Sequence, residues 1–337
     1  MSSENNNKVR ILSIDGGGIR GVIPGQVLVY VEQKIQELTG NQEARIADYF
    51  DFIAGTSTGG ILSCAYLAPD SSKRPKFTAQ EVVNLYMERG DDIFDIPLFH
   101  KLRTAGGLTD EKYPSAGIEE ALEDYFGDVK LSELLKPCLV TAYDIKRREA
   151  KFFRQHDTRG KSRDFYVRDV ARATGAAPTY FECARIKSMT NVVYPLIDGG
   201  LFANNPALCA YSDVRKFDKK PTAKSMAILS LGTGYAKKSY SYSEAKDFGM
   251  IDWIVPSLDI MMSGVSETVH YQLKQIYETT QNPNQYLRIN TALPQDVNAQ
   301  MDDASPENLQ ALKELGTELS EVKRTDLDAF IKNYLIR

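Results

Sequence analysis

Short apolar runs alternate with stretches that have apolar residues at helical spacing along the first two thirds of the chain. The short runs are typical of buried strands, and the periodic stretches are typical of helices. Strands are predicted at residues 9–15, 49–54, 138–143, 150–154, 192–197 and 227–231. Helices are predicted at residues 22–38, 61–67, 79–89 and 167–174. This alternation predicts an α/β fold, three-layer α/β/α, with helices on both faces of a mainly parallel central sheet.

The last third of the chain has a different pattern. Residues 240–337 are rich in helical periodicity and contain one predicted strand at residues 286–290. Residues 91–113 lack a clear period and are predicted to be a loop-rich insertion. We find no internal repeat and no low-complexity linker. We therefore expect a single domain over residues 8–337, with a catalytic core at about 8–235 and a helical C-terminal extension at about 240–337.

Composition narrows the class of protein. The chain has 337 residues, 42% of them hydrophobic and 26% charged, which is ordinary for a globular protein. A net charge of −4 does not suggest a nucleic-acid binder. The four cysteines form no C-x-x-C pair and the three histidines are scattered, so we expect buried reduced thiols, no metal site and no cofactor. The first eight residues are polar and no apolar stretch reaches ~20 residues, which predicts a cytoplasmic protein.

A glycine-rich loop follows the first predicted strand, in the sequence D-G-G-G-I-R-G at residues 15–21. The loop fits G-x-G-x-x-G, but a dinucleotide site would place an acidic residue roughly 20 positions later, after the second strand. The second strand here ends instead in Gly55-Thr56-Ser57, which disfavours that alternative. The amides of Gly16, Gly17 and Gly18 could instead bind an oxyanion at a helix N-terminus.

The second glycine-flanked site is Gly55-Thr56-Ser57-Thr58-Gly59, a G-x-S-x-G pattern between an apolar strand and an apolar helix. This context is that of a nucleophile elbow, a sharp turn that exposes a reactive serine. The alternative is a serine that only caps a helix. Placement between strand and helix favours Ser57 as a nucleophile.

A serine nucleophile needs a base. Among His100, His156 and His270, only His270 follows a plausible acid, and it lies inside a helical stretch, a poor position for a catalytic triad. Asp198 ends an apolar strand and precedes Gly199-Gly200, so we expect it at the same sheet edge as Ser57. A carboxylate there could take the serine proton directly. A Ser-Asp-His triad through His270 stays the alternative.

These three blocks, in this order and spacing, resemble the signature motifs of patatin-like phospholipases. The stretch A-T-G-A-A-P-T-Y-F at residues 173–181 is similar to a further block of that family, and the resemblance covers about residues 8–235. It implies a patatin-like fold, a Ser57–Asp198 dyad without histidine and an oxyanion hole from Gly16, Gly17 and Gly18. It also implies a calcium-independent lipid acyl hydrolase in which Arg20 helps to position the loop.

The resemblance has consequences for partners. A lipid hydrolase of this kind would act on phospholipid at a membrane surface, as a peripheral protein. Residues 145–172 carry ten basic and four acidic residues, a net charge of +6, and residues 250–262 are strongly apolar with the only tryptophan. Either segment could contact lipid, or simply be a solvated surface and a packing helix. Some bacterial proteins similar to this family are antiviral effectors activated by cyclic oligonucleotides, so a cyclic-nucleotide activator is a candidate partner. The chain could also form a homodimer. A catalytically silent lipid-binding module is an alternative function.

Overall fold

The computed structural model describes residues 8–94, 115–158, 160–236, 239–250 and 252–336. An eight-stranded sheet forms the centre, in the order β5-β6-β3-β2-β1-β7-β8, with β4 also paired to β3. The strands are β1 (Val9–Ile14), β2 (Phe52–Thr56), β3 (Cys138–Asp144), β4 (Glu149–Arg154), β5 (Ala184–Lys187), β6 (Val193–Asp198), β7 (Met226–Leu231) and β8 (Tyr286–Ile289). Strands β3, β2, β1, β7 and β8 are parallel, whereas β4, β5 and β6 add antiparallel pairs. The predicted mainly parallel α/β sheet is confirmed.

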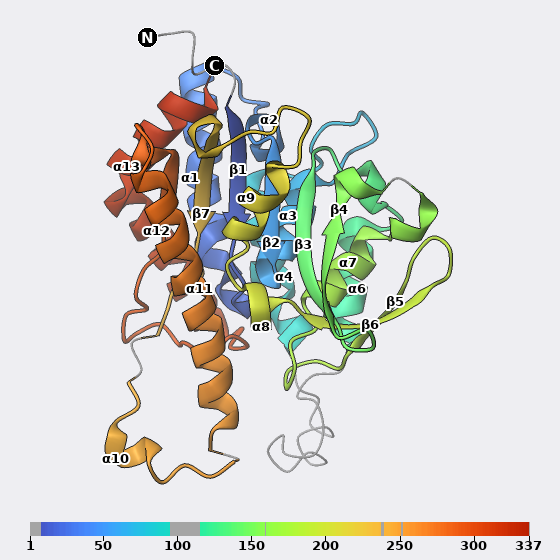
Figure 1. Cartoon of the computed structure of the whole chain (residues 1–337), viewed down its shortest axis with the longest axis vertical. Coiled ribbons are helices and arrows are strands. Elements are labelled where there is room, and N and C mark those ends of the chain that lie inside the picture. Colours follow the sequence, from blue (N-terminus) through green and yellow to red (C-terminus); the bar gives the residue numbers. More distant parts are fainter. Residues whose placement is uncertain (1–7, 95–114, 159, 237–238, 251, 337) are drawn as a thin grey trace.

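Helices cover both faces of this sheet (Figure 1). The helices of the described chain are α1 (Val22–Thr39), α2 (Ile46–Tyr49), α3 (Thr58–Leu67), α4 (Ala79–Phe94), α6 (Ala116–Phe126), α7 (Val167–Thr174), α8 (Gly200–Ala203), α9 (Ala207–Val214), α10 (Tyr242–Ala245), α11 (Ile254–Glu278), α12 (Pro306–Val322) and α13 (Arg324–Phe330), of which α10 lies below the sheet. Alternate residues of β1 face opposite ways, so Ile11 packs with α9 and α11 while Leu12 packs with α1 and α12. Burial on both faces explains why β1, β2, β3 and β7 read as nearly continuous apolar runs.

The C-terminal third is built into this core. Strand β8 pairs with β7 in parallel, and α11 covers the sheet face that α9 also covers. Five elements, α2, α6, α8, α9 and β5, had no counterpart in the sequence prediction. Part of the predicted insertion at residues 91–113 is helical, because α4 continues to Phe94, and the rest lies outside the described residues.

The registers of β3 place two strand ends against each other. Strand β4 pairs with one edge of β3, along residues 139–144. The other edge of β3 pairs with β2 at residues 138–141 and with β6 at residues 142–144. Thr56 pairs with Thr141, and Asp198 pairs with the next residue, Ala142. Because β6 is antiparallel to β3, the C-terminal ends of β2 and β6 meet from opposite directions.

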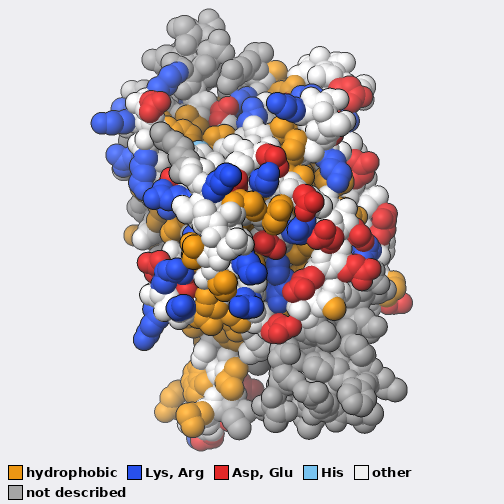
Figure 2. Space-filling model, turned by 90° about the vertical axis from the view of Figure 1, so that its right-hand side faces the viewer, with side chains coloured by type: hydrophobic (Ala, Val, Ile, Leu, Met, Phe, Trp, Pro, Cys, Tyr) orange, Lys and Arg blue, Asp and Glu red, His pale blue; other side chains and the backbone are white. Residues whose placement is uncertain are grey.

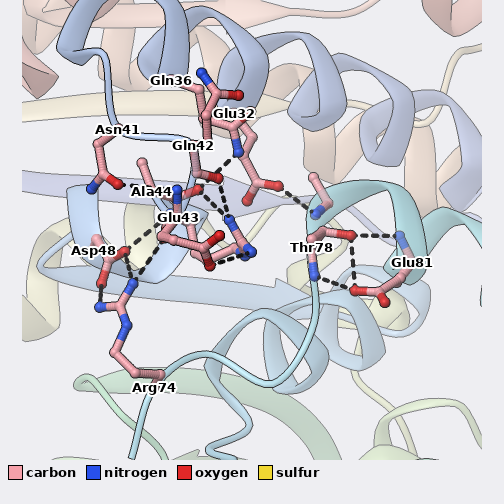
Figure 3. A network of polar contacts seen from close by, with 12 residues as sticks. Glu32, Gln36, Asn41, Gln42, Glu43, Ala44, Asp48, Arg74, Thr78 and Glu81 are labelled. Carbon is pink, nitrogen blue, oxygen red and sulfur yellow. Dashed lines mark hydrogen bonds and ion pairs between the residues drawn. The ribbon is translucent and has the colours of Figure 1, made fainter.

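A polar network near the amino end of the sheet links α1, α2 and the start of α4 (Figure 3). The buried carboxylate of Glu32 accepts hydrogen bonds from the amides of Ile46 and Ala79, at 3.1 and 2.8 Å. These are the first residues of α2 and α4, so one side chain caps two helices. Arg74 contacts both carboxylate oxygens of Asp48, at 2.6 and 2.8 Å. This end of the molecule is therefore held by structural contacts.

Candidate active site

Ser57 lies on the sharp turn between β2 and α3, at the carboxyl edge of the sheet. Its backbone has φ 55° and ψ −127°, in the region that non-glycine residues rarely adopt. A Cβ on Gly55 would collide with the carbonyl of Gly59, and one on Gly59 with the carbonyl of Ile14. The two glycines thus permit the close backbone approach that this turn requires.

A chain of buried threonine hydroxyls lies behind the serine. The Ser57 amide donates to Thr174 Oγ1 at 2.8 Å, and that hydroxyl donates to the carbonyl of Thr141 at 2.7 Å. Thr141 Oγ1 donates to Thr56 Oγ1 at 2.8 Å, which donates to the carbonyl of Ala203 at 2.6 Å. Sequence reasoning missed these residues, although Thr174 lies within the block at residues 173–181. The chain ties the turn to β3, α7 and α8.

Asp198 reaches the serine at the junction of β2 and β6. Asp198 is 5% exposed and lines the same pocket as Ser57, and its Oδ1 accepts the Gly200 amide at 2.7 Å. Burial raises the pKa of Asp198 to about 6, and its interactions with the Ser57 side chain and the Gly200 amide oppose that rise. Gly199 lies against Thr141, where a Cβ would collide with the threonine side chain.

The route by which Asp198 arrives differs from the expected one. Sequence reasoning placed it at the edge where parallel strands end, but β6 is antiparallel to β3. Asp198 lies near Ser57 because β2 and β6 pair with the same edge of β3 in opposite directions, so their C-terminal ends adjoin. The expected proximity is present, for a different topological reason.

The glycine loop lies beside these two side chains. The amide of Gly16 already donates to the carbonyl of Asn204 at 3.0 Å. Gly17 and Gly18 line the pocket that also contains Ser57, and their amides show no hydrogen bond within the described part of the chain. Gly18 has φ 59°, a conformation that glycine adopts without strain. The free donors of the loop are thus those of Gly17 and Gly18.

Arg20 supports the loop from within. Its Nε donates to the carbonyl of Gly17 at 3.3 Å, and its side chain lines the pocket. Burial lowers the pKa of Arg20, and the charge of Asp259 partly offsets this. The guanidinium keeps its charge, because the ordinary arginine pKa lies far above neutrality.

A buried ion pair anchors the start of the glycine loop. Arg288 Nη1 and Nη2 contact Asp15 Oδ1 and Oδ2 at 2.9 and 2.5 Å, and Nη1 also donates to Ser230 Oγ at 2.9 Å. Both charged side chains are buried, with exposed fractions of 3% for Asp15 and 8% for Arg288. Arg288 belongs to β8, which gives the C-terminal third a direct role at the site. No local motif around Arg288 indicated this contact.

The pocket has a volume of about 370 Å³ and is mainly apolar. Its walls come from the glycine loop, the segment after α7, the start of α11 and the loop at residues 298–301. Apolar and aromatic lining residues include Ile61, Tyr86, Ile118, Pro178, Tyr180, Phe181, Leu201, Tyr240, Leu258, Met262 and Met301. Its polar lining residues include Ser57 and Asp198, together with Arg20, Thr58, Thr179, Asp259, Asn298 and Gln300. The apolar part of the space suits a flexible hydrocarbon chain beside the Ser57 side chain.

The two histidines in the described part of the chain, His156 and His270, are not arranged for a triad with Ser57. His270 Nδ1 contacts the hydroxyl of Tyr286 at 3.0 Å, and His270 is not among the pocket-lining residues. Burial lowers the pKa of His270, with the charges of Arg288 and Lys274 adding to the effect. His156 pairs with Asp213 at 2.8 Å, and His100 lies outside the described residues.

The other expected features can also be located. Cys64 and Cys138 are buried free thiols, but Cys183 is exposed and Cys209 half-buried, so uniform burial was a wrong prediction. In the described ranges no cluster of three or more His, Cys, Asp or Glu side chains could hold a metal ion. The same residues include no helix both long and apolar enough to cross a membrane.

Five of the ten basic residues in the segment at residues 145–172 form ion pairs within the described chain. Its arginines contact acidic residues, several of them outside the segment; the pairs include Arg147–Asp144, Arg154–Asp213, Arg163–Asp157, Arg168–Asp128 and Arg172–Glu119. The face seen in Figure 2 carries both signs of charge, with basic side chains more frequent on its left and acidic ones on its right. The surface is less positive than the local sequence suggests.

Comparison with known proteins gives a consistent result. The family described as Patatin-like phospholipase matches residues 12–211. Patatin-like protein 2 of Arabidopsis thaliana is 34% identical over 350 residues, covering 96% of this chain and 86% of that protein. Probable inactive patatin-3-Kuras 1 of Solanum tuberosum is 30% identical and covers 92% of this chain and 86% of its own length.

Among solved structures, VipD from Legionella pneumophila has a TM-score of 0.40 at 12% identity, covering 96% of this chain and 67% of VipD, too weak a likeness to support a conclusion. The sequence matches are sufficient to assign the family without a structural likeness. With more than half of its length matched by the family and relatives above 30% identity along nearly all of it, this chain belongs to the patatin-like phospholipase family.

Proposed function

We propose that the protein hydrolyses fatty acyl esters of glycerophospholipids through a Ser57–Asp198 dyad. Family membership supports the coarser statement, a lipid acyl hydrolase. The observation that carries the finer proposal is the placement of Ser57, on a strained turn, in the same pocket as the buried Asp198 carboxylate, whose pKa responds to the serine side chain. A carboxylate with a pKa of about 6 is largely ionised at neutral pH and still accepts a proton readily.

Acylation follows from this arrangement. Ser57 Oγ bonds to the ester carbonyl carbon while Asp198 takes the hydroxyl proton. The tetrahedral intermediate carries its negative charge on the former carbonyl oxygen. When it collapses, the carbon–oxygen bond to the glycerol breaks and Asp198 gives the proton to the departing alcohol oxygen.

Deacylation reverses the roles. Water attacks the acyl-enzyme carbonyl as Asp198 takes one of its protons, and collapse breaks the bond to Ser57 Oγ. The proton returns to Ser57, and a fatty acid leaves. Asp198 acts as the base and then as the acid in both steps, so a histidine is not required.

We assign the oxyanion donors to Gly17 and Gly18. Gly16 is left out because its amide is engaged by the Asn204 carbonyl. Arg20 then acts through its bond to the Gly17 carbonyl, and Asp15 through its pair with Arg288. One preorganised donor of this type typically contributes about 10²–10³ in rate.

The test is release of fatty acid from mixed phospholipids by the purified protein. Ser57→Ala and Asp198→Asn are expected to lose at least about 10³-fold in kcat, because each removes one half of the dyad. His270→Ala is the matched control and should retain wild-type activity. Undiminished hydrolysis in Asp198→Asn, or its loss in His270→Ala, would refute the dyad in favour of the triad.

A catalytically silent lipid-binding module is the competing function, and one relative carries the label inactive. It predicts lipid binding without product release and no labelling of Ser57 by a fluorophosphonate. Regulation by a cyclic oligonucleotide rests on sequence resemblance alone. We propose this regulation as well and test it by adding cyclic oligonucleotides to the fatty acid release assay. A higher rate supports the regulation, and an unchanged rate overturns it.

A further inference from the structure

Exposed apolar side chains concentrate in one segment. Of the twelve large apolar side chains exposed in the described part of the chain, seven lie within residues 235–261. We call five of them the apolar rim: Tyr242, Met250, Trp253, Ile254 and Met261. Met250 is 91% exposed. The segment forms the lower end of the molecule in Figure 1, well away from the network at the amino end of the sheet.

The apolar rim continues into the wall of the pocket. Tyr240 lines the pocket and packs edge-on against Phe248, with centroids 6.3 Å apart, and Phe248 packs edge-on against Trp253 at 5.2 Å. Ile254 lies one helical turn before Leu258, which lines the pocket. One helix and one aromatic row therefore run from exposed surface to the site of chemistry.

Charge indicates what kind of partner fits this surface. Residues 235–261 contain three basic and four acidic residues, so the segment does not attract anions. A phosphate-bearing polymer or a strongly anionic surface would find little complement there. Exposed methionine, isoleucine, tyrosine and tryptophan instead match the boundary between headgroups and hydrocarbon, where aromatic rings are favoured.

We propose that the apolar rim inserts into the hydrocarbon boundary of a lipid bilayer and delivers an acyl chain to the pocket. The occupant is a lipid surface rather than a soluble partner because the exposed segment is continuous with an apolar pocket that ends at Ser57. The delivery of an acyl chain rests on the proposed lipid hydrolysis. The binding itself can be measured without catalysis.

Trp253 is the only tryptophan of the chain, so its fluorescence reports on the apolar rim directly. Vesicles of zwitterionic phosphatidylcholine should shift its emission to the blue, equally at low and at high salt. Met250→Glu and Ile254→Glu should each weaken vesicle binding at least about tenfold, since burying one such side chain contributes a factor of that order. Val322→Glu, at a 70% exposed position on α12, is the matched control and should bind like wild type.

Two readouts separate this proposal from the catalytic one. Ser57→Ala should bind vesicles normally, and the rim variants should hydrolyse a monomeric soluble ester at the wild-type rate while losing activity on vesicles. Wild-type binding by both rim variants would overturn the proposal, as would binding that high salt abolishes. So would a dimer in sedimentation that Met250→Glu dissociates, because the surface would then join two copies of the chain.

Discussion

Replacing Thr174 by valine isolates the hydroxyl that supports the nucleophile turn. Valine has nearly the shape of threonine, so the change removes the oxygen without opening a cavity. The Ser57 amide loses its acceptor at 2.8 Å and the Thr141 carbonyl loses a donor at 2.7 Å. Thr174, Thr141 and the Ser57 amide are buried away from water, so solvent does not replace these contacts.

The expected cost follows from the two unsatisfied groups. A buried donor or acceptor without a partner costs about 1–3 kcal/mol, so Thr174→Val should lower the free energy of unfolding by about 2–4 kcal/mol. Ser57 also holds a backbone conformation that itself costs about 1–3 kcal/mol and needs surrounding contacts to persist. Partial relaxation of the turn moves Oγ away from Asp198. We expect kcat to fall about 10- to 100-fold with KM little changed, which is ~1.4–2.8 kcal/mol in the transition state.

The assay combines thermal unfolding with kcat and KM on a soluble ester. Thr174→Ser keeps the hydroxyl and loses only the methyl group that packs near Gly60, so it should retain most of the wild-type kcat despite a lower Tm. If Thr174→Val keeps both wild-type kcat and wild-type stability, the threonine hydroxyl does not support the turn and this reasoning is refuted. Equal losses in Thr174→Val and Thr174→Ser would instead assign the effect to packing.

Three further predictions test other contacts. Because Asp198 must be ionised to accept a proton and its pKa is about 6, kcat/KM on a soluble ester should be flat above pH 6 and fall about tenfold per unit below it; a profile unchanged down to pH 4 would contradict this. Arg288→Met leaves Asp15 buried and unpaired and should cost about 3–5 kcal/mol in urea unfolding, with partial recovery when Asp15→Asn is added. Glu32→Ala removes the shared acceptor of two helix starts and should lower the free energy of unfolding by about 2–4 kcal/mol, Glu32→Gln by less, whereas equal values for the two variants would argue against the double cap.

The sequence predicts the parallel part of the sheet well because each of its strands is buried on both faces and reads as a short apolar run. Strand β5 escaped prediction because it has four residues, of which Arg185 and Lys187 point to solvent. Helix α9 is brief and lies among small residues without a strong period. The local sequence pattern therefore predicts the central strands of the sheet better than the short elements at its edge.

The site is predicted in its residue types but not in its contacts. Ser57, Asp198 and the glycine loop stand out through their placement after strands, which a single sequence shows. The direction of β6 is not encoded in its own residues, since a strand reads alike either way. Which loop amides are free depends on Asn204, and the anchor of Asp15 depends on Arg288, 273 positions later. Such long-range contacts leave no local signal.

The meeting of β2 and β6 has a consequence for how the proposed activity is lost. The proposed nucleophile, Ser57, follows β2 in the fully buried middle of the sheet, whereas the proposed base, Asp198, ends β6, whose outer neighbour is the short, alternately exposed edge strand β5. Edge elements with few buried contacts open at lower free energy than the core. Opening of β5 and β6 would remove Asp198 while Ser57 stays in place. Activity should therefore disappear at lower denaturant concentration than the global unfolding signal, and amides of β6 should exchange hydrogen faster than those of β2.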